Sequence, residues 1–196
     1  MGKSDIMLDL ETLSLEDNPV IIQLSAIQFD LKTGQTYSEF SETINPKSCI
    51  ESGLALDSST ISWWLTQEMT AINDVFINSI TSGKELSSVL DDFSNFVKNV
   101  REGNERISVW GNGILADNLW LKSAYSNSKK KIPWKYFENK DVRTLADLGS
   151  RILNKDIKNE TKFEGVQHNA IDDCKHQIKY CHEIYKQLEK MKIPCY

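Results

Sequence analysis

The sequence of 196 residues lacks the features of secreted, membrane-spanning and disulfide-stabilised proteins. Its four cysteines form no CxxC pair, which favours reduced thiols over a disulfide framework. No apolar run approaches the roughly 18 residues that a membrane span requires. The N-terminus also lacks the basic and then apolar segments of a secretion signal. We therefore expect a cytoplasmic protein with no membrane partner.

An excess of positive charge is also missing. The chain has 23 Lys and Arg against 28 Asp and Glu, a formal net charge of −5, whereas proteins that bind nucleic acid are usually basic. This balance excludes a broad electrostatic binder of nucleic acid. It does not exclude an enzyme that grips a few nucleotides, particularly if several of the acids bind metal ions.

The chain contains no internal repeat, low-complexity tract or linker, and its length suits one domain over residues 1–196. Apolar runs predict strands at 6–12 and 20–29, and a more polar segment at 37–44 predicts a third strand. The short connections between them predict antiparallel pairing. An amphipathic helix over 86–100 leads to a fourth strand at 106–110, which implies a parallel crossover. We therefore predict a mixed α/β fold, with an antiparallel meander and parallel strands in one sheet flanked by helices.

The remaining segments are less regular. A short helix after Asp57 should carry Ile61, Trp64, Leu65 and Met69 on one face. Another helix should follow the glycine turn at 111–113, and a long last helix should run from about 169 to 192. We expect residues 45–56 to be irregular and residues 154–167 to form a mobile loop.

Two acids mark the end of the first strand. Asp9 and Glu11 are two residues apart, so their side chains project from the same face of the strand. Two adjacent anions repel each other unless a cation lies between them, and oxygen ligands suit Mg²⁺ or Mn²⁺. A frayed strand end with two solvated acids is the alternative explanation for these residues alone.

Two helix starts carry further acids. Asp117 begins the helix after the fourth strand, and Asp173 lies in the first turn of the last helix within the pattern His168-x-Ala170-x-x-Asp173. The strand end and these helix starts can meet at one edge of the sheet. Four carboxylates there could hold two divalent cations, which would clamp a phosphate for an in-line displacement.

These motifs resemble those of the DEDDh 3′–5′ exonucleases, a family with a ribonuclease H-like fold. The resemblance lies in Asp9-x-Glu11-Thr12, in Asn112 with Asp117, and in the histidine motif that ends at Asp173, and it spans residues 6–185. A closer likeness is to a branch with phage exodeoxyribonucleases and mycobacterial exoribonuclease-like domains. Its marks are the segments 60–64, 110–113, 133–136 and 141–145.

The resemblance implies a role for each motif residue. Asp9, Glu11, Asp117 and Asp173 would bind two Mg²⁺ or Mn²⁺ ions, with Asp9 bridging them, and these acids together with His168 would be catalytic. His168 would take the proton from the attacking water, because its side chain titrates near neutrality. Thr12 and Asn112 would line the cleft near the 3′-terminal nucleotide.

Two further side chains have alternative explanations. Trp63 points away from the apolar face of its short helix, so it either packs against a neighbouring loop or forms an aromatic platform for a nucleobase. Arg143 lies near two acids in sequence, and we expect it to form a structural ion pair with Asp141 or Asp147.

The function predicted from these residues is a metal-dependent 3′–5′ exonuclease that releases nucleoside 5′-monophosphates. Its partners would be the 3′ ends of single-stranded or 3′-overhanging nucleic acid, with DNA slightly favoured over RNA. The sequence does not fix the oligomeric state, so both a monomer and a homo-oligomer are compatible with it. The alternatives are a catalytically weak module that binds nucleic acid and a small-molecule phosphohydrolase, although the latter usually needs an aspartate in place of Glu11.

Overall fold

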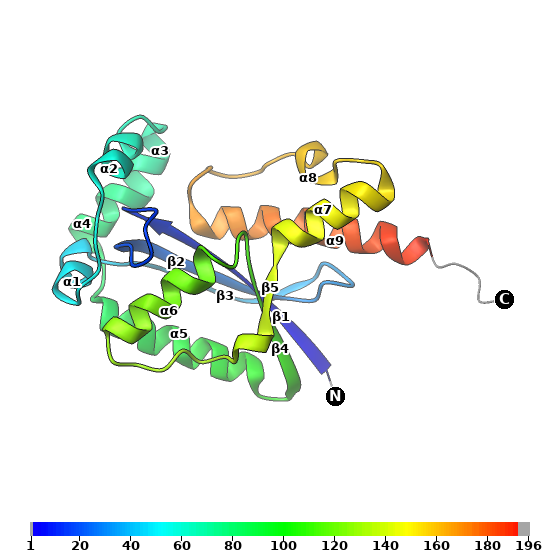
Figure 1. Cartoon of the computed structure of the whole chain (residues 1–196), viewed down its shortest axis with the longest axis horizontal. Coiled ribbons are helices and arrows are strands. Elements are labelled where there is room, and N and C mark those ends of the chain that lie inside the picture. The colour runs from blue at the N-terminus through cyan, green and yellow to red at the C-terminus, as the bar shows by residue number, and fades with distance from the viewer. Residues whose placement is uncertain (1, 192–196) are drawn as a thin grey trace.

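A five-stranded sheet organises the computed structural model, which describes residues 2–191. Four residues named in the predictions lie outside the described residues. They are Met1 and Tyr196, which bound the predicted domain, Lys192, which ends the predicted last helix, and Cys195. The strands lie in the order β3-β2-β1-β4-β5 (Figure 1). They are β1 (Gly2–Thr12), β2 (Ile21–Phe29), β3 (Thr36–Thr43), β4 (Asn104–Gly111) and β5 (Asn139–Asp141).

The pairing of the strands confirms the predicted mixed sheet. β1, β2 and β3 form the antiparallel meander, because their connections are too short for a crossover. β4 lies parallel to β1, and β5 parallel to β4. Between β3 and β4 the chain forms α1 (Pro46–Glu51), α2 (Ser58–Trp64), α3 (Met69–Ala71), the π-helix η1 (Ile72–Ile77), α4 (Asn78–Ser82) and α5 (Leu86–Arg101). After β4 come α6 (Asp117–Asn127), the 3₁₀ turn η2 (Tyr136–Glu138), α7 (Val142–Leu153), α8 (Ile157–Glu160) and α9 (Ala170–Lys190).

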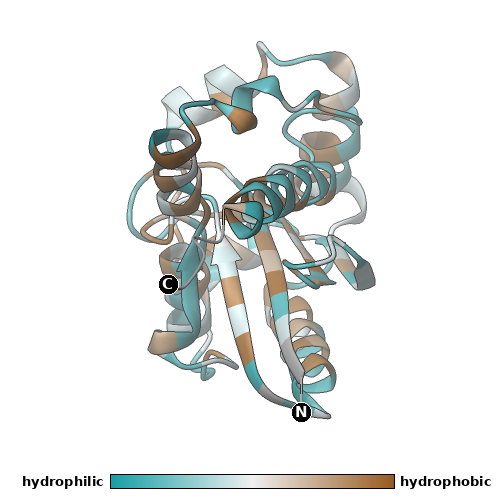
Figure 2. Cartoon of the chain, turned by 90° about the vertical axis from the view of Figure 1, so that its right-hand side faces the viewer, coloured by the Kyte–Doolittle hydropathy of each residue, from teal (hydrophilic) through white to brown (hydrophobic). Residues whose placement is uncertain are grey.

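Helices cover both faces of the sheet, as Figure 1 shows. Alternate residues of β1 point to opposite faces: Ile6, Leu8 and Leu10 join the core formed with α5 and α6. Met7 instead joins the core formed with α7 and α9. Brown bands alternate with paler or teal residues along the strands in Figure 2. Asp9 and Glu11 have the same parity as Met7, so the fold directs both acids towards the α9 side of the sheet.

Two predictions about the segments after β3 need correction. Residues 45–56 contain α1, whose first turn is capped by the side chain of Asn45, rather than being irregular. The short helix α2 ends at Trp64, so Leu65 and Met69 do not share its buried face; they are 63% and 65% exposed. The indole of Trp64 donates a hydrogen bond to the carbonyl oxygen of Thr12 at 2.9 Å, which fixes α2 against the end of β1.

The segment 154–167 is more structured than predicted. It contains α8, which is capped by Asp156 and holds Ile157 in the core near α7 and α9. At its far end, the backbone N–H of Val166 donates to the carboxylate of Asp172 at 3.0 Å. The segment is therefore an arm attached at both ends to helices. No helix in the described part of the chain is long and apolar enough to cross a membrane.

Candidate active site

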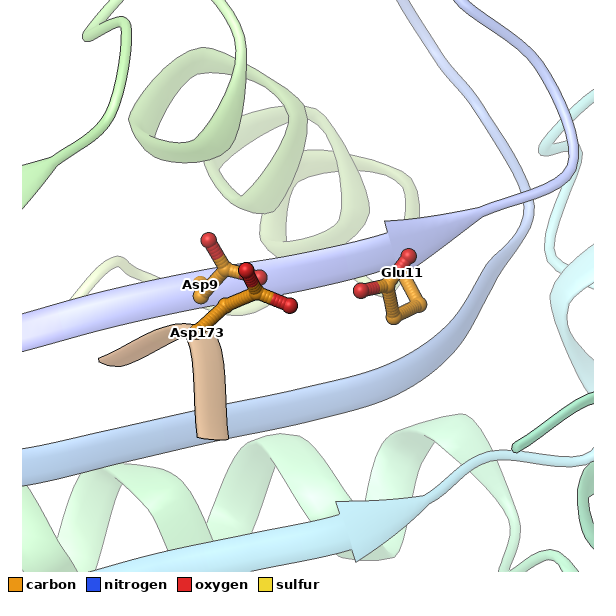
Figure 3. A group of neighbouring side chains, drawn as sticks. All are labelled: Asp9, Glu11 and Asp173. Atoms are coloured by element: carbon orange, nitrogen blue, oxygen red, sulfur yellow. The ribbon is translucent and has the colours of Figure 1, made fainter. Parts of the chain in front are cut away.

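Three of the predicted acids meet where β1 passes the first turn of α9 (Figure 3). Asp9, Glu11 and Asp173 each place one carboxylate oxygen within 4.8 Å of the others. Asp9 and Glu11 are only 9% and 8% exposed. Oxygen atoms this close to one another form a suitable ligand set for a hard divalent cation.

Asp117 approaches the same cluster from the start of α6. Its carboxylate accepts hydrogen bonds from the backbone N–H groups of Asn112, Leu10 and Asp117 itself. Asp117 is not among the three acids whose oxygen atoms lie within 4.8 Å of one another. Its charge nevertheless contributes to the raised pKa of Asp9. The carboxylates at the strand end and at the two helix starts therefore lie near one another, which fits the arrangement suggested by the sequence.

The pKa values of the four carboxyl groups are all raised. Burial is the largest cause for each, and it raises the pKa of Asp117 to about 7 and that of Asp173 to about 6. The pKa values of Asp9 and Glu11 lie well above the ordinary range, because the neighbouring carboxylates add repulsion to the effect of burial. This repulsion would be relieved by a bound cation.

The start of α9 is anchored to β2 through Gln23. The backbone N–H of Ala170 donates to Oε1 of Gln23 at 2.9 Å, and Nε2 of Gln23 donates to Oδ1 of Asn169 at 3.2 Å. Asn169 in turn caps the helix through the N–H of Ile171. These contacts set the position of Asp173 on the first turn of α9 relative to β1.

His168 precedes this helix in a left-handed backbone conformation, with φ of 62°. Its N–H donates to Oδ2 of Asp173 at 3.0 Å. Its ring makes edge contacts with Trp63 and Trp64, at centroid distances of 4.8 and 6.5 Å. Partial burial lowers the pKa of His168, so the neutral ring that could accept a proton is favoured.

Two hollows lie beside the carboxylates. One has a volume of about 440 Å³, is lined by Glu11, Thr12, Trp63 and apolar residues that include Leu15 and Trp120, and lies near the end of β1. The other has a volume of about 290 Å³ and is lined by Asn112, His168 and Asp173, among others. Thr12 and Asn112, predicted to line one cleft, thus border different hollows. Trp63 packs against His168 and is also 42% exposed towards the first hollow.

The sequence interpretation missed Gln177. Its Nε2 donates to Oδ1 of Asp9 at 2.7 Å, which leaves its buried Oε1 without a partner among the described residues. Gln177 lies four residues after Asp173, so the two side chains share one face of α9. That spacing is the signal that could have identified it as a neighbour of the carboxylates.

The prediction for Arg143 was wrong. Asp147 pairs instead with Arg151 at 2.8 Å, and the Asp141 carboxylate accepts a hydrogen bond from the backbone N–H of Arg143. The guanidinium lies over Gly113, where an added Cβ would be 3.2 Å from its Cζ. Its charge lowers the pKa of Asp117, so Arg143 acts on the carboxylate cluster.

The combination of a ribonuclease H-like sheet, four converging acids and a histidine before the last acid defines the DEDDh class of 3′–5′ exonucleases. The chain belongs to the family described as the 3′–5′ exoribonuclease Rv2179c-like domain, whose model matches residues 4–185. No curated protein sequence matches the chain.

Solved structures with a similar fold are distant in sequence. The nuclease domain of 3′hExo, described as a DEDDh family member bound to rAMP, has a TM-score of 0.66 and 17% identity, over 94% of this chain and 92% of that one. S. pombe Pop2p in its Mg²⁺- and Mn²⁺-bound form has a TM-score of 0.62 and 14% identity, over 96% and 85%. E. coli Exonuclease I in complex with a dT13 oligonucleotide has a TM-score of 0.64 and 10% identity, over 96% of this chain and 41% of that one.

Proposed function

We propose that this 3′–5′ exonuclease removes nucleotides one at a time from single-stranded 3′ ends and releases nucleoside 5′-monophosphates. The observation that carries the proposal is the meeting of Asp9, Glu11 and Asp173 within 4.8 Å beside Asp117 and His168. Membership in an exonuclease family favours this reaction over the two alternatives, a non-catalytic binding module and a small-molecule phosphohydrolase.

The four acids fit two divalent cations, Mg²⁺ or Mn²⁺. Asp9, Glu11 and Asp173 would hold one ion, and Asp117 would contribute to the second beside Asp9. When bound, the ions would stabilise negative charge on the phosphate during an in-line displacement. The donor set supports this assignment, because three buried carboxylates and the half-buried Asp173, all with raised pKa values, need positive charge to ionise together.

The chain itself supplies the base and the positioning groups. Neutral His168 accepts a proton from the attacking water, whose oxygen forms a new bond to phosphorus. The bond from phosphorus to the 3′ oxygen of the preceding nucleotide breaks, and that oxygen takes a proton from solvent water, which leaves a 3′ hydroxyl on the shortened strand. Gln177 holds one oxygen of Asp9 and so orients the carboxylate.

The hollow beside Glu11 supports binding of the terminal nucleoside. Its apolar lining, with Leu15, Trp63 and Trp120, suits a nucleobase, and the hydroxyl groups of Ser59 and Thr60 border the same space. A base that enters there would lie on the Glu11 side of the carboxylates. We include Thr12 and Asn112 as substrate contacts on the two sides of the cluster.

A 5′-labelled oligonucleotide tests the proposal directly. In Mg²⁺ it should shorten by one nucleotide at a time, and EDTA should stop the reaction. Matched DNA and RNA strands, single- and double-stranded, then measure the preference for sugar and for strandedness. Our sequence-based expectation is DNA, whereas the family description is that of an exoribonuclease. A 3′-phosphorylated or internally cut product would contradict the assigned reaction.

We also extend the proposal to the remaining expectations from sequence. Residues 1–196 form one exonuclease domain, and the buried free thiols of Cys49, Cys174 and Cys181 support a location in the reducing cytoplasm.

A further inference from the structure

Positive charge is concentrated in one part of this acidic chain. Residues 122–140 contain six lysines and a single acid, Glu138, whereas the whole chain carries a formal charge of −5. Glu138 is buried and paired with Arg101 at 2.8 Å, so it does not offset the lysines at the surface. Lys130 also has a partner, Asp91. The remaining lysines give this segment a net positive charge.

Exposed aromatic rings lie within this positive region. Tyr136 is 86% exposed and Phe137 is 44% exposed, and their rings meet edge to face at a centroid distance of 5.4 Å. The Arg106 guanidinium and the Lys135 ammonium both lie over the Phe137 ring, at 5.7 and 5.6 Å from its centroid. The two cations pack on the Phe137 ring, and Tyr136 beside it is the ring exposed for stacking with a nucleobase.

The fold connects this surface to the active site. η2 leads into β5, the edge strand of the sheet, which runs parallel to β4 towards Gly111 (Figure 1). Lys140 lies on β5, and α7 begins directly after β5 at Val142. The next residue, Arg143, has its guanidinium over Gly113. Cations therefore follow the sheet edge from Arg106 to the loop next to Asp117.

The length of this path suits a short single strand. Arg106 and Gly111 are five residues apart on β4, which is roughly 17 Å at about 3.3 Å per residue. A stacked single strand would cover that distance with about five nucleotides at ~3.4 Å each. Lysine and arginine side chains complement its phosphates, and the aromatic rings complement its bases, without selecting a sequence.

We propose that the surface formed by Arg106, Lys135, Tyr136, Phe137 and Lys140, here called the edge surface, binds the single strand upstream of the nucleotide being removed. This inference rests on the proposed exonuclease function for its substrate class. The edge surface makes no contact with the scissile phosphate, so it acts on affinity for longer strands and leaves the chemical step unchanged.

Strand length tests this proposal in the intact protein with Mg²⁺. KM should fall as oligonucleotides lengthen from two to about seven nucleotides and should then level off. About five of these nucleotides would lie on the edge surface and about two at the active site. The triple variant Lys135→Gln/Tyr136→Ala/Lys140→Gln should raise KM for a 12-nucleotide strand about tenfold. Its kcat, and its KM for a dinucleotide, should match the wild-type values.

The opposite edge of the sheet offers a matched control. Lys32→Gln/Tyr37→Ala/Lys47→Gln removes the same charges and the same kind of exposed ring at or near β3, and it should leave every value unchanged. Equal melting temperatures for the two variants would show that both are folded. A KM independent of strand length, or an equal effect of the two triple variants, would overturn the proposal.

Binding without cleavage separates this inference from the proposed function. In EDTA, fluorescence anisotropy of a labelled 12-nucleotide strand should show weaker binding to the edge variant than to the control variant. Loss of two phosphate contacts should reduce the slope of log K against log salt by about 1.4. If the wild type cleaves no strand, the proposed function fails, while this binding difference still supports the edge surface. Equal binding by both variants would overturn the edge surface, whatever the activity.

Discussion

Each acid in the site has a raised pKa for reasons that depend on its neighbours. Burial and the charges of Asp117, Glu11 and Asp173 raise the pKa of Asp9. The hydrogen bond from Gln177 lowers this pKa, because it favours the ionised form. Asp117 is buried to a similar degree, yet three backbone N–H groups and Arg143 limit the rise of its pKa. The pKa of each acid in this site thus depends on the charges and hydrogen-bond donors around it.

Removing one charge tests this account of Asp9. We expect Asp9→Asn to abolish cleavage and to leave the metal-free protein at least as stable as the wild type, because one repelling charge is lost. The asparagine oxygen can still accept the hydrogen bond from Gln177. Thermal melting in EDTA gives the stability, with the exposed Asp147→Asn as the control. A metal-free variant that melts well below the wild type would make Asp9 chiefly a structural residue.

A second prediction at this scale concerns the base. Removing the His168 ring should lower kcat by about 10²–10⁴-fold, the usual contribution of a general base. His168→Asn is the better variant, because asparagine tolerates the positive φ of 62° that alanine disfavours. Binding of oligonucleotide and of Mg²⁺ should persist.

The pH profile provides the check on His168. The wild-type rate at saturating Mg²⁺ should rise as the imidazole loses its proton, with an apparent pKa at or below that of an ordinary histidine, since burial lowers it. The rate of His168→Asn should lack this step. A variant that cleaves within a few-fold of the wild type and keeps the same profile would show that His168 is not the base.

The residues predicted from sequence were those in local patterns. Asp9 with Glu11, and His168 with Asp173, are defined by their spacing on one strand or helix start, which the sequence displays directly. Arg143 could not be placed in this way, because its contact with Gly113 depends on how α7 packs beside the loop after β4. The nearest acids in sequence were therefore the wrong partners.

At the scale of elements, the arm at 154–167 borders the site and is held against α9 by a few contacts, which include the ion pair of Glu164 with Lys179 at 2.9 Å. Ile157 fixes α8 at one end, and the bond from Val166 to Asp172 fixes the other. Phe163 and Gln167 line the hollow shared with His168 and Asp173. Closure of this arm over a bound nucleotide would exclude water from the site.

Limited proteolysis tests whether the arm closes. Cleavage in the wild type should occur first within residues 158–165, where exposed polar side chains predominate. Mg²⁺ together with a nucleoside 5′-monophosphate should slow cleavage of the arm several-fold. Either ligand alone should slow this cleavage less than the two together. The exposed turn at 32–35 serves as an internal reference whose cleavage should not change. Equal cleavage of the arm with and without both ligands would remove the gating role.

Elements with strong periodicity were predicted closely, and those set by packing were not. α5 has its apolar residues at three- and four-residue spacing, and the structure places it at Leu86–Arg101. The π-helix η1 and the helix α4 after it have no such pattern, and no element was predicted there. Their conformation depends on Ile72 and Val75 packing into the core, which only the assembled fold reveals.

At the scale of the whole molecule, the order of strands followed from the lengths of the connections. Short turns gave the meander of β1, β2 and β3, and the long excursion through α5 gave the parallel pair of β1 and β4. This topology brings the ends of β1 and β4 beside the start of α9, so the buried acids lie within the framework that the core stabilises. Charge in the site is therefore coupled to the stability of the entire domain.

That coupling gives the last prediction, a metal-dependent effect of pH on folding. In the folded metal-free protein the pKa of Asp173 is about 6 and that of Asp117 about 7, against an ordinary value of 3.8. The folded state therefore holds more protons than the unfolded chain between about pH 4 and pH 7, and the free energy of unfolding contributed by these groups falls as pH rises through this window.

Mg²⁺ binds the ionised acids of the folded state, so it should raise the melting temperature more at pH 8 than at pH 5. Thermal melting with Mg²⁺, or with KCl of equal ionic strength, distinguishes binding from charge screening. The double variant Asp117→Asn/Asp173→Asn should have a weaker pH dependence between pH 4 and pH 7, with the remainder coming from Asp9 and Glu11, and should lose most of the Mg²⁺ effect. If the melting temperatures of the wild type and of this variant depend on pH in the same way in EDTA, the carboxylates are not under electrostatic strain.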